Sequence, residues 1–428
     1  MTLTLPRRLV RINLRTDFLR EYIQLFLNDQ TNERIRNEFR NQGAYSAPDD
    51  DYSAWIQETY EKICAQVDEL PVYSVVANDL TDWIKAIQNA TIVELGPEDP
   101  WTDNQGLIQV RRMTADDLES QVDLPESKHE YEDYLDVIKL PLPIPEAKLS
   151  EGAQFLFVRP DEYALFKCFT KHDWCILTGN PGISKSWFQW KFILFCYRLD
   201  LFDQFSPVIE EIPVEGLKTQ PFIPKLIVRT MAGEESWLFF VGRNDTDVLY
   251  VKHDLSSLRS FSDVNTTILW EPASITTPVY YAGVKARIIV TVSPNKERIH
   301  EFRKRARMFY TPCPSELQIR LMGQVFRTFA SELVYCPSDA EIHERVVNFG
   351  PCIRTALCLA SDELEPFIKT RNDKIESLVT DPRKLRSRIQ IMEPSTGKCL
   401  SHRSVRFVVN RNSTAPFLGY TAQHYELS

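Results

Sequence analysis

One short segment, "TGNPGISKSWF" at residues 178–188, limits the folds open to this chain more than any other part of the sequence. The apolar run "DWCILT" precedes it, and "WFQWKFILFCYRLDLF", which is apolar nearly all round, follows it. This succession indicates a strand, a glycine-containing loop and a helix that is buried on several sides. Further apolar runs, "KLIVRTM", "SWLFFVG", "DVLYVKH", "TTILWE" and "ARIIVTVS", predict more strands. Continuous apolar strands that alternate with helices favour an α/β fold with a mainly parallel sheet.

The loop resembles the phosphate-binding pattern G-x-x-x-x-G-K-[ST]. Gly179, Lys185 and Ser186 occupy the required positions, and Ser184 stands where the second glycine is expected. In such a loop the backbone N–H groups surround phosphates, the lysine reaches the terminal phosphates and the hydroxyl binds Mg²⁺. A serine forced to φ > 0 costs roughly 1 kcal/mol, which weakens such a site without abolishing it. We therefore predict a site for ATP, or another nucleoside triphosphate, and Mg²⁺ at Gly179, Asn180, Pro181, Gly182, Ile183, Ser184, Lys185 and Ser186. The simpler alternative is an ordinary strand–turn–helix with a surface lysine.

Two other predicted strands end on polar residues that would complete such a site. Glu271 follows "TTILW", where a carboxylate would hold Mg²⁺ together with Ser186. Ser293 and Asn295 follow "ARIIVTV", where a polar group would orient the attacking water. The alternatives are a strand that ends on a surface glutamate and a plain Ser-Pro-Asn turn.

The net charge of −9 is unevenly distributed. Residues 1–150 carry 28 acidic and 15 basic side chains, and the remainder has an excess of 4 basic ones. The acidic part is a poor nucleic-acid surface, because phosphate neutralisation needs lysine and arginine. The basic run "KERIHEFRKRAR" at 296–307 could supply an arginine finger or contact a phosphate backbone. A solvated helix face explains the same run more simply.

Changes in composition, together with proline-rich and helix-capping segments, divide the chain into five predicted parts. These are an acidic, mostly helical N-terminal region at 1–138, a proline-rich linker at 139–149, an α/β core at 150–312, a helical lid at 313–384 and a short β-containing tail at 385–428. The lid carries two capping boxes, at Ser315 with Gln318 and at Ser338 with Glu341. In the tail, "RSRIQIM" and "SVRFVVN" predict two short strands.

The cysteines and the hydropathy pattern indicate the cellular environment. There are nine cysteines and no C-x-x-C pair, and Cys168, Cys175, Cys196 and Cys358 lie among apolar residues. This predicts buried thiols in a reducing compartment rather than disulfides or a zinc site. No signal-peptide core and no run of about 18 apolar residues occurs, so we expect an intracellular protein, cytoplasmic or nuclear, with no membrane partner.

The order of these pieces resembles the P-loop NTPase domain of Crinkler effectors and retrotransposon hot spot proteins. The resemblance covers roughly residues 150–360 and rests on "FLFVRPDEY", the loop, the strand ending at Glu271, the run from "IIVTVSPNKERIHEFRKRARMFYTPCPSELQ" and "FGPCIRTAL". It implies that Arg354 is a lid arginine that reaches nucleotide phosphate, as in AAA-type and related ATPases. Ser184, Glu271 and Pro351 depart from the family's Gly, Asp and Gly. The resemblance would also imply delivery into a host cell, although the chain lacks the family's usual N-terminal header.

These observations support three functional hypotheses. The first is an ATP-binding, Mg²⁺-dependent switch with slow or no hydrolysis, whose output is a change of conformation or of homo-oligomeric state. The second is an inactive interaction protein on a degenerate NTPase scaffold, with the acidic N-terminal region binding a protein partner. The third is an effector that acts on nucleic acid through the 296–307 segment.

Overall fold

The computed structural model describes most of the chain from residue 74 to residue 360. The described ranges are 74–118, 134–145, 154–179, 185–206, 222–230, 235–241, 247–252, 264–272, 285–292, 305–329 and 336–358, together with two strands near the C-terminus and a few isolated positions. All structural statements below refer to these residues.

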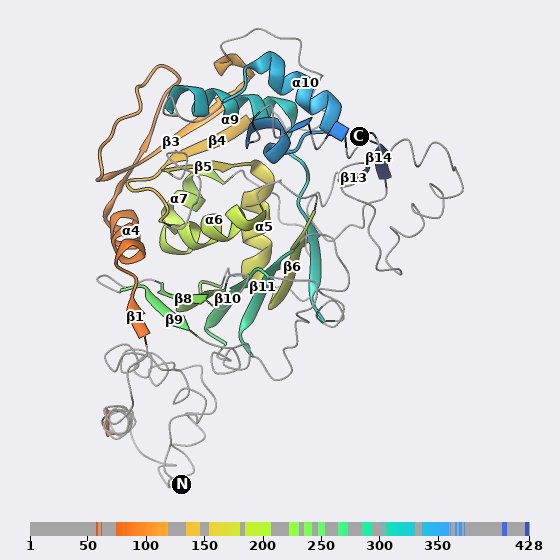
Figure 1. The fold of residues 1–428 in the computed structure, drawn as a ribbon. Coiled ribbons are helices and arrows are strands. Elements are labelled where there is room, and N and C mark those ends of the chain that lie inside the picture. Colours follow the sequence, from red (N-terminus) through yellow and green to blue (C-terminus); the bar gives the residue numbers. More distant parts are fainter. Residues whose placement is uncertain are drawn as a thin grey trace.

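An eight-stranded sheet forms the base of the molecule (Figure 1). Its strands, from one edge to the other, are β1 (Ser74–Val76), β9 (Leu249–Lys252), β8 (Glu235–Phe240), β7 (Leu226–Thr230), β10 (Thr266–Trp270), β11 (Arg287–Thr291), β6 (Trp174–Thr178) and β12 (Arg307–Tyr310). The run from β7 to β12 is parallel throughout, and β8, β9 and β1 extend it with antiparallel pairs. The predicted α/β class with a mainly parallel sheet is therefore confirmed.

The central strands are buried along their whole length. Every residue of β7, β10 and β11 is buried, as is expected when a parallel sheet is covered on both faces. The strands predicted from apolar runs at β6 to β11 are all present. β12 is an additional strand that the sequence patterns did not predict; its first residue, Arg307, is the last residue of the basic run.

A layer of helices separates this sheet from a second, four-stranded sheet (Figure 1). The helices are α4 (Asn78–Asn89), α5 (Pro160–Lys171), α6 (Lys185–Tyr197) and α7 (Leu199–Phe205). The second sheet has the order β2 (Thr91–Glu94), β3 (Leu107–Thr114), β4 (Tyr134–Lys139) and β5 (Phe155–Val158). One aromatic-rich core joins the helices to both sheets, and within it Trp83 of α4 meets Trp190 of α6 edge to face at 5.4 Å.

The predicted helical lid packs on the outer face of the four-stranded sheet. It contains α9 (Glu316–Phe329), α10 (Asp339–Phe349) and a π-helical turn, η6 (Arg354–Cys358). Both predicted capping boxes are present, at the starts of α9 and α10. A second apolar core joins these helices to β3, β4 and β5. The short 3-10 helix η1 (Ala115–Asp117) follows β3.

Of the N-terminal region 1–138 that was predicted to be mostly helical, the described residues lie mainly at 74–118 and 134–138, and the helices expected near residues 17–30 and 52–70 lie almost entirely outside them. Between Ser74 and Lys139 there are four strands, one 3-10 turn and only one α-helix. The predicted linker at 139–149 is partly wrong, because β4 runs through Lys139 and the side chains of Leu140 and Ile144 are buried. Moreover, β1 belongs to the large sheet and β5 to the small one, so the two sheets do not divide near residue 150.

The tail contains a two-stranded antiparallel pair, β13 (Val405–Val408) and β14 (His424–Leu427). β13 confirms the strand expected at "SVRFVVN", whereas "RSRIQIM" lies outside the described residues. None of the seven described cysteines forms a disulfide, and Cys175 and Cys196 are buried as expected. Cys358 is exposed, contrary to expectation, because it ends the last turn of η6.

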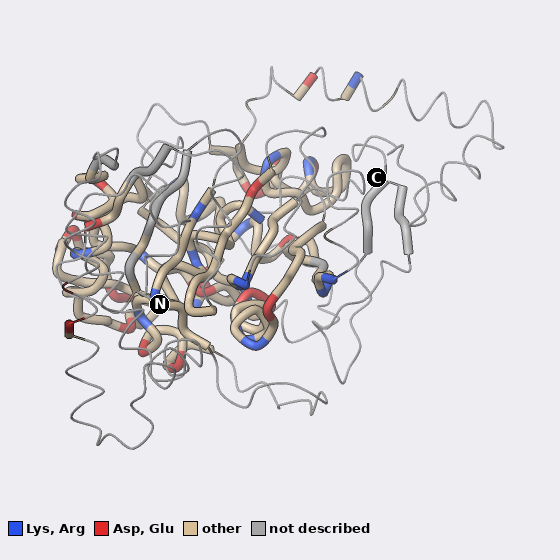
Figure 2. Tube along the Cα trace, turned by 90° about the horizontal axis from the view of Figure 1, so that it is seen from below, with Lys and Arg blue, Asp and Glu red and all other residues tan. Residues whose placement is uncertain are grey.

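Acidic and basic residues both occur throughout the described chain, and acidic ones are most frequent on one side. Figure 2 shows acidic residues gathered on the side of the molecule where α4 and β2 lie in Figure 1. Within the described ranges, no helix combines the length and the apolar character that crossing a bilayer requires.

Candidate functional site

The segment 174–197 contains the predicted strand and the predicted helix. β6 ends at Thr178, Gly179 follows, and α6 begins at Lys185. Gly179 has φ 148°, a backbone conformation that residues with a Cβ rarely adopt, which explains a glycine at this point. Between them, Asn180, Pro181, Gly182, Ile183 and Ser184 lie outside the described residues.

Lys185 is a partly buried cation at the start of α6. Its Nζ donates a hydrogen bond to the carbonyl oxygen of Gly179 at 3.0 Å. Burial lowers the pKa of Lys185 to about 8, while the thiols of Cys352 and Cys313 and the carboxylate of Glu271 act in the opposite direction. An anion beside the ammonium group would stabilise its charged form and raise this pKa.

Ser186 and Glu271 meet although 85 residues separate them. Ser186 Oγ donates a hydrogen bond to Glu271 Oε1 at 2.7 Å. Ser186 lies in the first turn of α6, and Glu271 directly follows β10, which is separated from β6 by β11. Because the carboxyl ends of parallel strands share one edge of a sheet, the chain brings a hydroxyl and a carboxylate together there. Two oxygen groups of this kind fit Mg²⁺, whose remaining ligands are commonly phosphates and water.

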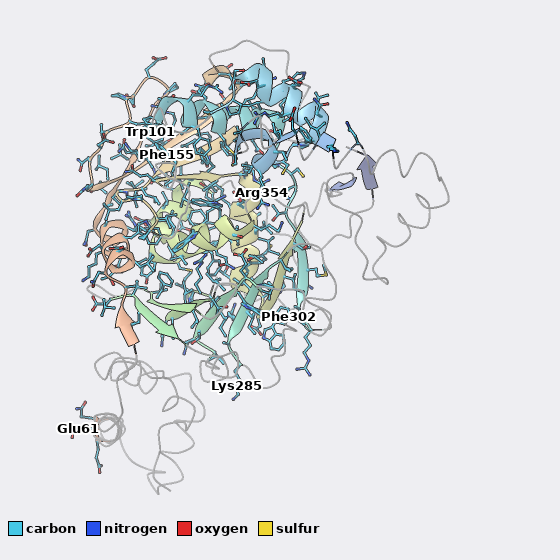
Figure 3. All side chains as sticks on the ribbon, viewed as in Figure 1. Glu61, Trp101, Phe155, Lys285, Phe302 and Arg354 are labelled. Carbon is cyan, nitrogen blue, oxygen red and sulfur yellow. The ribbon has the colours of Figure 1, made fainter. Side chains whose placement is uncertain are left out.

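Arg354 approaches the same site from the lid. It is the first residue of η6, four residues after Gly350, which ends α10 with φ 76°. The Arg354 side chain is exposed, and its positive charge helps to lower the pKa of Lys185. In Figure 3 it lies below α10, on the side of the lid that faces α5. The structure therefore groups Lys185, Ser186, Glu271 and Arg354, four of the predicted site residues.

A buried polar chain lies beneath this group and was not predicted. Gln189 Nε2 donates to Thr291 Oγ1 at 2.8 Å, and Arg229 Nε donates to Gln189 Oε1 at 3.2 Å. The Arg229 guanidinium also lies 4.4 Å from the ring centroid of Trp190. This chain ties α6 to β11 and β7 near their carboxyl ends. The sequence feature that could have predicted these contacts is a polar residue within an apolar segment: Gln189 in "WFQWKF" and Arg229 in "LIVRT".

A second buried network connects α5, α6 and the segment that leads into the lid. Lys191 Nζ lies 2.6 Å from Glu162 Oε2, and Arg159 Nη2 lies 3.6 Å from Glu162 Oε1. Arg159 Nη1 also donates to the carbonyl oxygen of Pro312 at 2.8 Å. Burial alone would raise the pKa of Glu162, but the charges of Lys191 and Arg159 hold it below its ordinary value. "VRPDEY" therefore has a structural role at the start of α5 that the sequence alone did not define.

The remaining predicted residues are not placed together with this group. Ser293 and Asn295 lie outside the described residues, as does most of the basic run at 296–307. β11, which precedes Ser293, runs beside β6, and Val292 N donates to Leu177 O at 3.0 Å. Of the basic run, Arg305 and Arg307 are described, and both are exposed.

Among the described residues there is no cluster of three or more His, Cys, Asp or Glu side chains that could bind a metal ion unaided. A metal at Ser186 and Glu271 would need further ligands, which water or a bound phosphate could supply. No protein-family model and no curated protein matches this chain.

Proposed function

We propose that this chain is an ATP-binding, Mg²⁺-dependent P-loop protein of the Crinkler and retrotransposon hot spot type. It would act as a nucleotide-dependent switch with slow or no hydrolysis. The observation that carries the proposal is the Ser186–Glu271 hydrogen bond, because it joins the loop hydroxyl to a carboxylate from a separate strand.

The sheet order supports the same proposal. Counted in chain order, the five parallel strands from β12 to β7 run 5-1-4-3-2. One strand thus stands between the strand before the loop and the strand that precedes Glu271. The order would leave room for the γ-phosphate beside the end of β11, where Ser293 and Asn295 follow in the sequence.

Each described residue then has a distinct task. Lys185 would neutralise the β- and γ-phosphates, and the backbone amides of 180–186 would surround them. Ser186 and Glu271 would hold Mg²⁺, which neutralises phosphate charge when it is bound. Arg354 would contact the terminal phosphate and so make the position of the lid depend on the bound nucleotide. We expect little turnover because Ser184 replaces a glycine and Glu271 is a single carboxylate.

Calorimetry with ATP, with and without Mg²⁺, tests this function on the full chain, on Lys185→Ala and on the matched control Lys85→Ala. Lys85 is a surface residue of α4 that faces Asp247, so the control removes a lysine without touching the site. We expect Mg²⁺-dependent binding that Lys185→Ala abolishes and Lys85→Ala preserves. The absence of binding at millimolar ATP in the unmodified chain would contradict the proposal and favour an inactive scaffold.

A further inference from the structure

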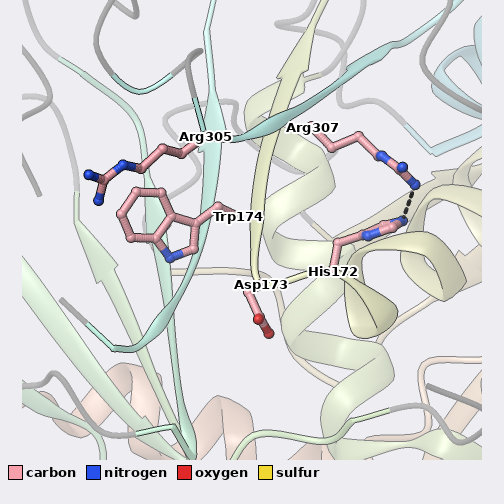
Figure 4. A pocket seen from close by; sticks show the side chains of 5 residues that line it. All are labelled: His172, Asp173, Trp174, Arg305 and Arg307. Atoms are coloured by element: carbon pink, nitrogen blue, oxygen red, sulfur yellow. Dashed lines mark hydrogen bonds between the residues drawn. The ribbon is translucent and has the colours of Figure 1, made fainter. Parts of the chain in front are cut away.

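The opposite edge of the large sheet carries a second candidate binding site. There, the amino ends of the parallel strands β6 and β12 border an open hollow of about 390 Å³ (Figure 4). It is lined by His172, Asp173, Trp174, Arg305 and Arg307. Thr178 lies four residue steps after Trp174 along β6, so roughly 13 Å of strand lies between this hollow and the candidate nucleotide site.

The hollow carries an excess of positive charge. Arg307 Nη1 donates a hydrogen bond to His172 Nε2 at 3.1 Å, so the ring must be neutral at that nitrogen. Burial and the charge of Arg307 lower the pKa of His172 to about 4, which keeps the ring uncharged near neutral pH. Among the described residues, neither Arg305 nor Arg307 lies within salt-bridge distance of a carboxylate. Asp173, the one carboxylate of the hollow, is 3.6 Å from Arg287 Nη2.

The hollow also has an aromatic surface. The indole of Trp174 stacks on Phe302 with ring centroids 5.2 Å apart and an interplanar angle of 13°. Phe302 is buried, so this contact holds the indole in one orientation. In Figure 4 the indole lies beside the Arg305 side chain, while Arg307 and His172 lie on the other side of β6. An arginine beside a supported aromatic ring, with a second arginine across β6, suits a ligand that has phosphates and planar bases.

We propose that this hollow binds single-stranded nucleic acid, with phosphates on Arg305 and Arg307 and a base against Trp174. The open shape suits a strand that passes through, because five residues would not enclose a small molecule. The basic run that ends at Arg307 carries four further cations, Lys296, Arg298, Arg303 and Lys304. This site does not depend on the proposed nucleotide site.

Fluorescence anisotropy with a labelled oligothymidylate of about 15 nucleotides tests the proposal at low salt. Arg305→Glu and Arg307→Glu are compared with Lys369→Glu, which makes the same charge change at an exposed position far from this segment in the sequence. We expect each arginine variant to weaken binding at least fivefold and to reduce the salt dependence, with the control within twofold of the unmodified chain. Equal affinity of all four proteins would overturn the proposal.

Two tryptophan variants test the stacking contact separately. Trp174→Ala should weaken binding roughly fivefold or more, and Trp174→Phe should retain most of it. If Trp174→Ala does not fold, as circular dichroism would show, the quenching of tryptophan fluorescence by the oligonucleotide provides the test. That quenching should be lost in Trp174→Phe. A duplex of equal length that binds as tightly as the single strand would contradict the proposal.

Lys185→Ala should bind the oligonucleotide with unchanged affinity, so this proposal and the proposed nucleotide site can be tested independently.

Discussion

Ser186 Oγ lies 2.7 Å from Glu271 Oε1, and this contact links the first turn of α6 to the end of β10 across an intervening strand. Its geometry predicts that the two side chains act as one unit on a metal. We expect Ser186→Ala and Glu271→Gln each to lower the Mg²⁺-dependent affinity for ATP roughly tenfold, or about 1.4 kcal/mol. The double variant should be little worse than either single variant, because both lose the same ion. Calorimetry over a Mg²⁺ titration measures this, and fully additive losses would count against a shared ion.

The lowered pKa of Lys185 predicts that ATP binding depends on pH. Only the charged amine neutralises phosphate, and with a pKa of about 8 its charged fraction falls steeply between pH 7 and pH 9. Phosphates raise that pKa, so binding takes up a proton. The affinity for ATP should therefore fall about tenfold over this interval. Calorimetry in two buffers of different ionisation enthalpy would detect the proton uptake. Lys185→Arg supplies the control, because arginine keeps its charge over this range; an unchanged pH dependence in that variant would exclude Lys185 as its source.

Arg354 predicts a shift of that pH profile from a residue outside the loop. Its positive charge helps to lower the pKa of Lys185, so Arg354→Gln should move the midpoint of the ATP-binding profile to higher pH. The same variant should weaken ATP binding severalfold at pH 7, because a phosphate contact is lost. Glu344→Gln, a neutralisation on the neighbouring helix α10, serves as the control for general effects on the lid. If the affinity for ATP falls while the midpoint pH stays unchanged, Arg354 does not act near Lys185.

The buried network around Glu162 predicts unequal costs for its members. Glu162→Gln removes the ion pairs to both Lys191 and Arg159, whereas Lys191→Met removes only one. Breaking a buried pair costs about 3–5 kcal/mol, so we expect the Glu162 variant to lie near the upper end and the Lys191 variant below it. Urea unfolding at pH 7 gives both values. Equal losses would mean that Arg159 does not support Glu162.

The same network predicts how the free energy of unfolding changes as the pH falls. The pKa of Glu162 is held below its ordinary value of 4.5, so its contribution to stability is present above that pH and is lost as the pH falls through the folded-state pKa. The difference in unfolding free energy between the unmodified chain and Glu162→Gln should therefore narrow below pH 4.5. A difference that stays constant down to pH 3 would contradict this assignment.

Long apolar runs made the central strands and α6 predictable, because burial on both faces leaves a continuous signal in the sequence. The direction of neighbouring strands was harder to predict from the sequence, although the length of the connection between two strands limits it. Only residues 231–234 join β7 to β8, too few for the crossover of a dozen or more residues that a parallel pair requires. β3, with "LIQVRRMT", was missed because its buried residues do not alternate regularly and its partner β4 begins 20 residues later.

Some residues of the candidate site could likewise be predicted from the sequence, and others could not. The proximity of Ser186 and Glu271 was predictable because Ser186 belongs to a known loop pattern and Glu271 follows a predicted strand of the same sheet. That of Gln189 and Arg229 was not, since their contact exists only once β7, β10 and β11 have taken their places beside α6. Sheet order follows from long-range packing, which local patterns do not encode.

The position of β1 has a practical consequence for dissecting the chain. β1 pairs with β9 at one margin of the large sheet, whereas β6 lies six strand positions away, a separation of roughly 30 Å. The first described strand therefore lies far from the candidate site at Lys185 and Ser186. A shortened chain that starts a few residues before Ser74 would keep β1 and its pairing with β9. One that starts at residue 150, as composition suggested, would remove β1, α4 and most of the second sheet, and would expose the backbone of β9 to pairing with other molecules.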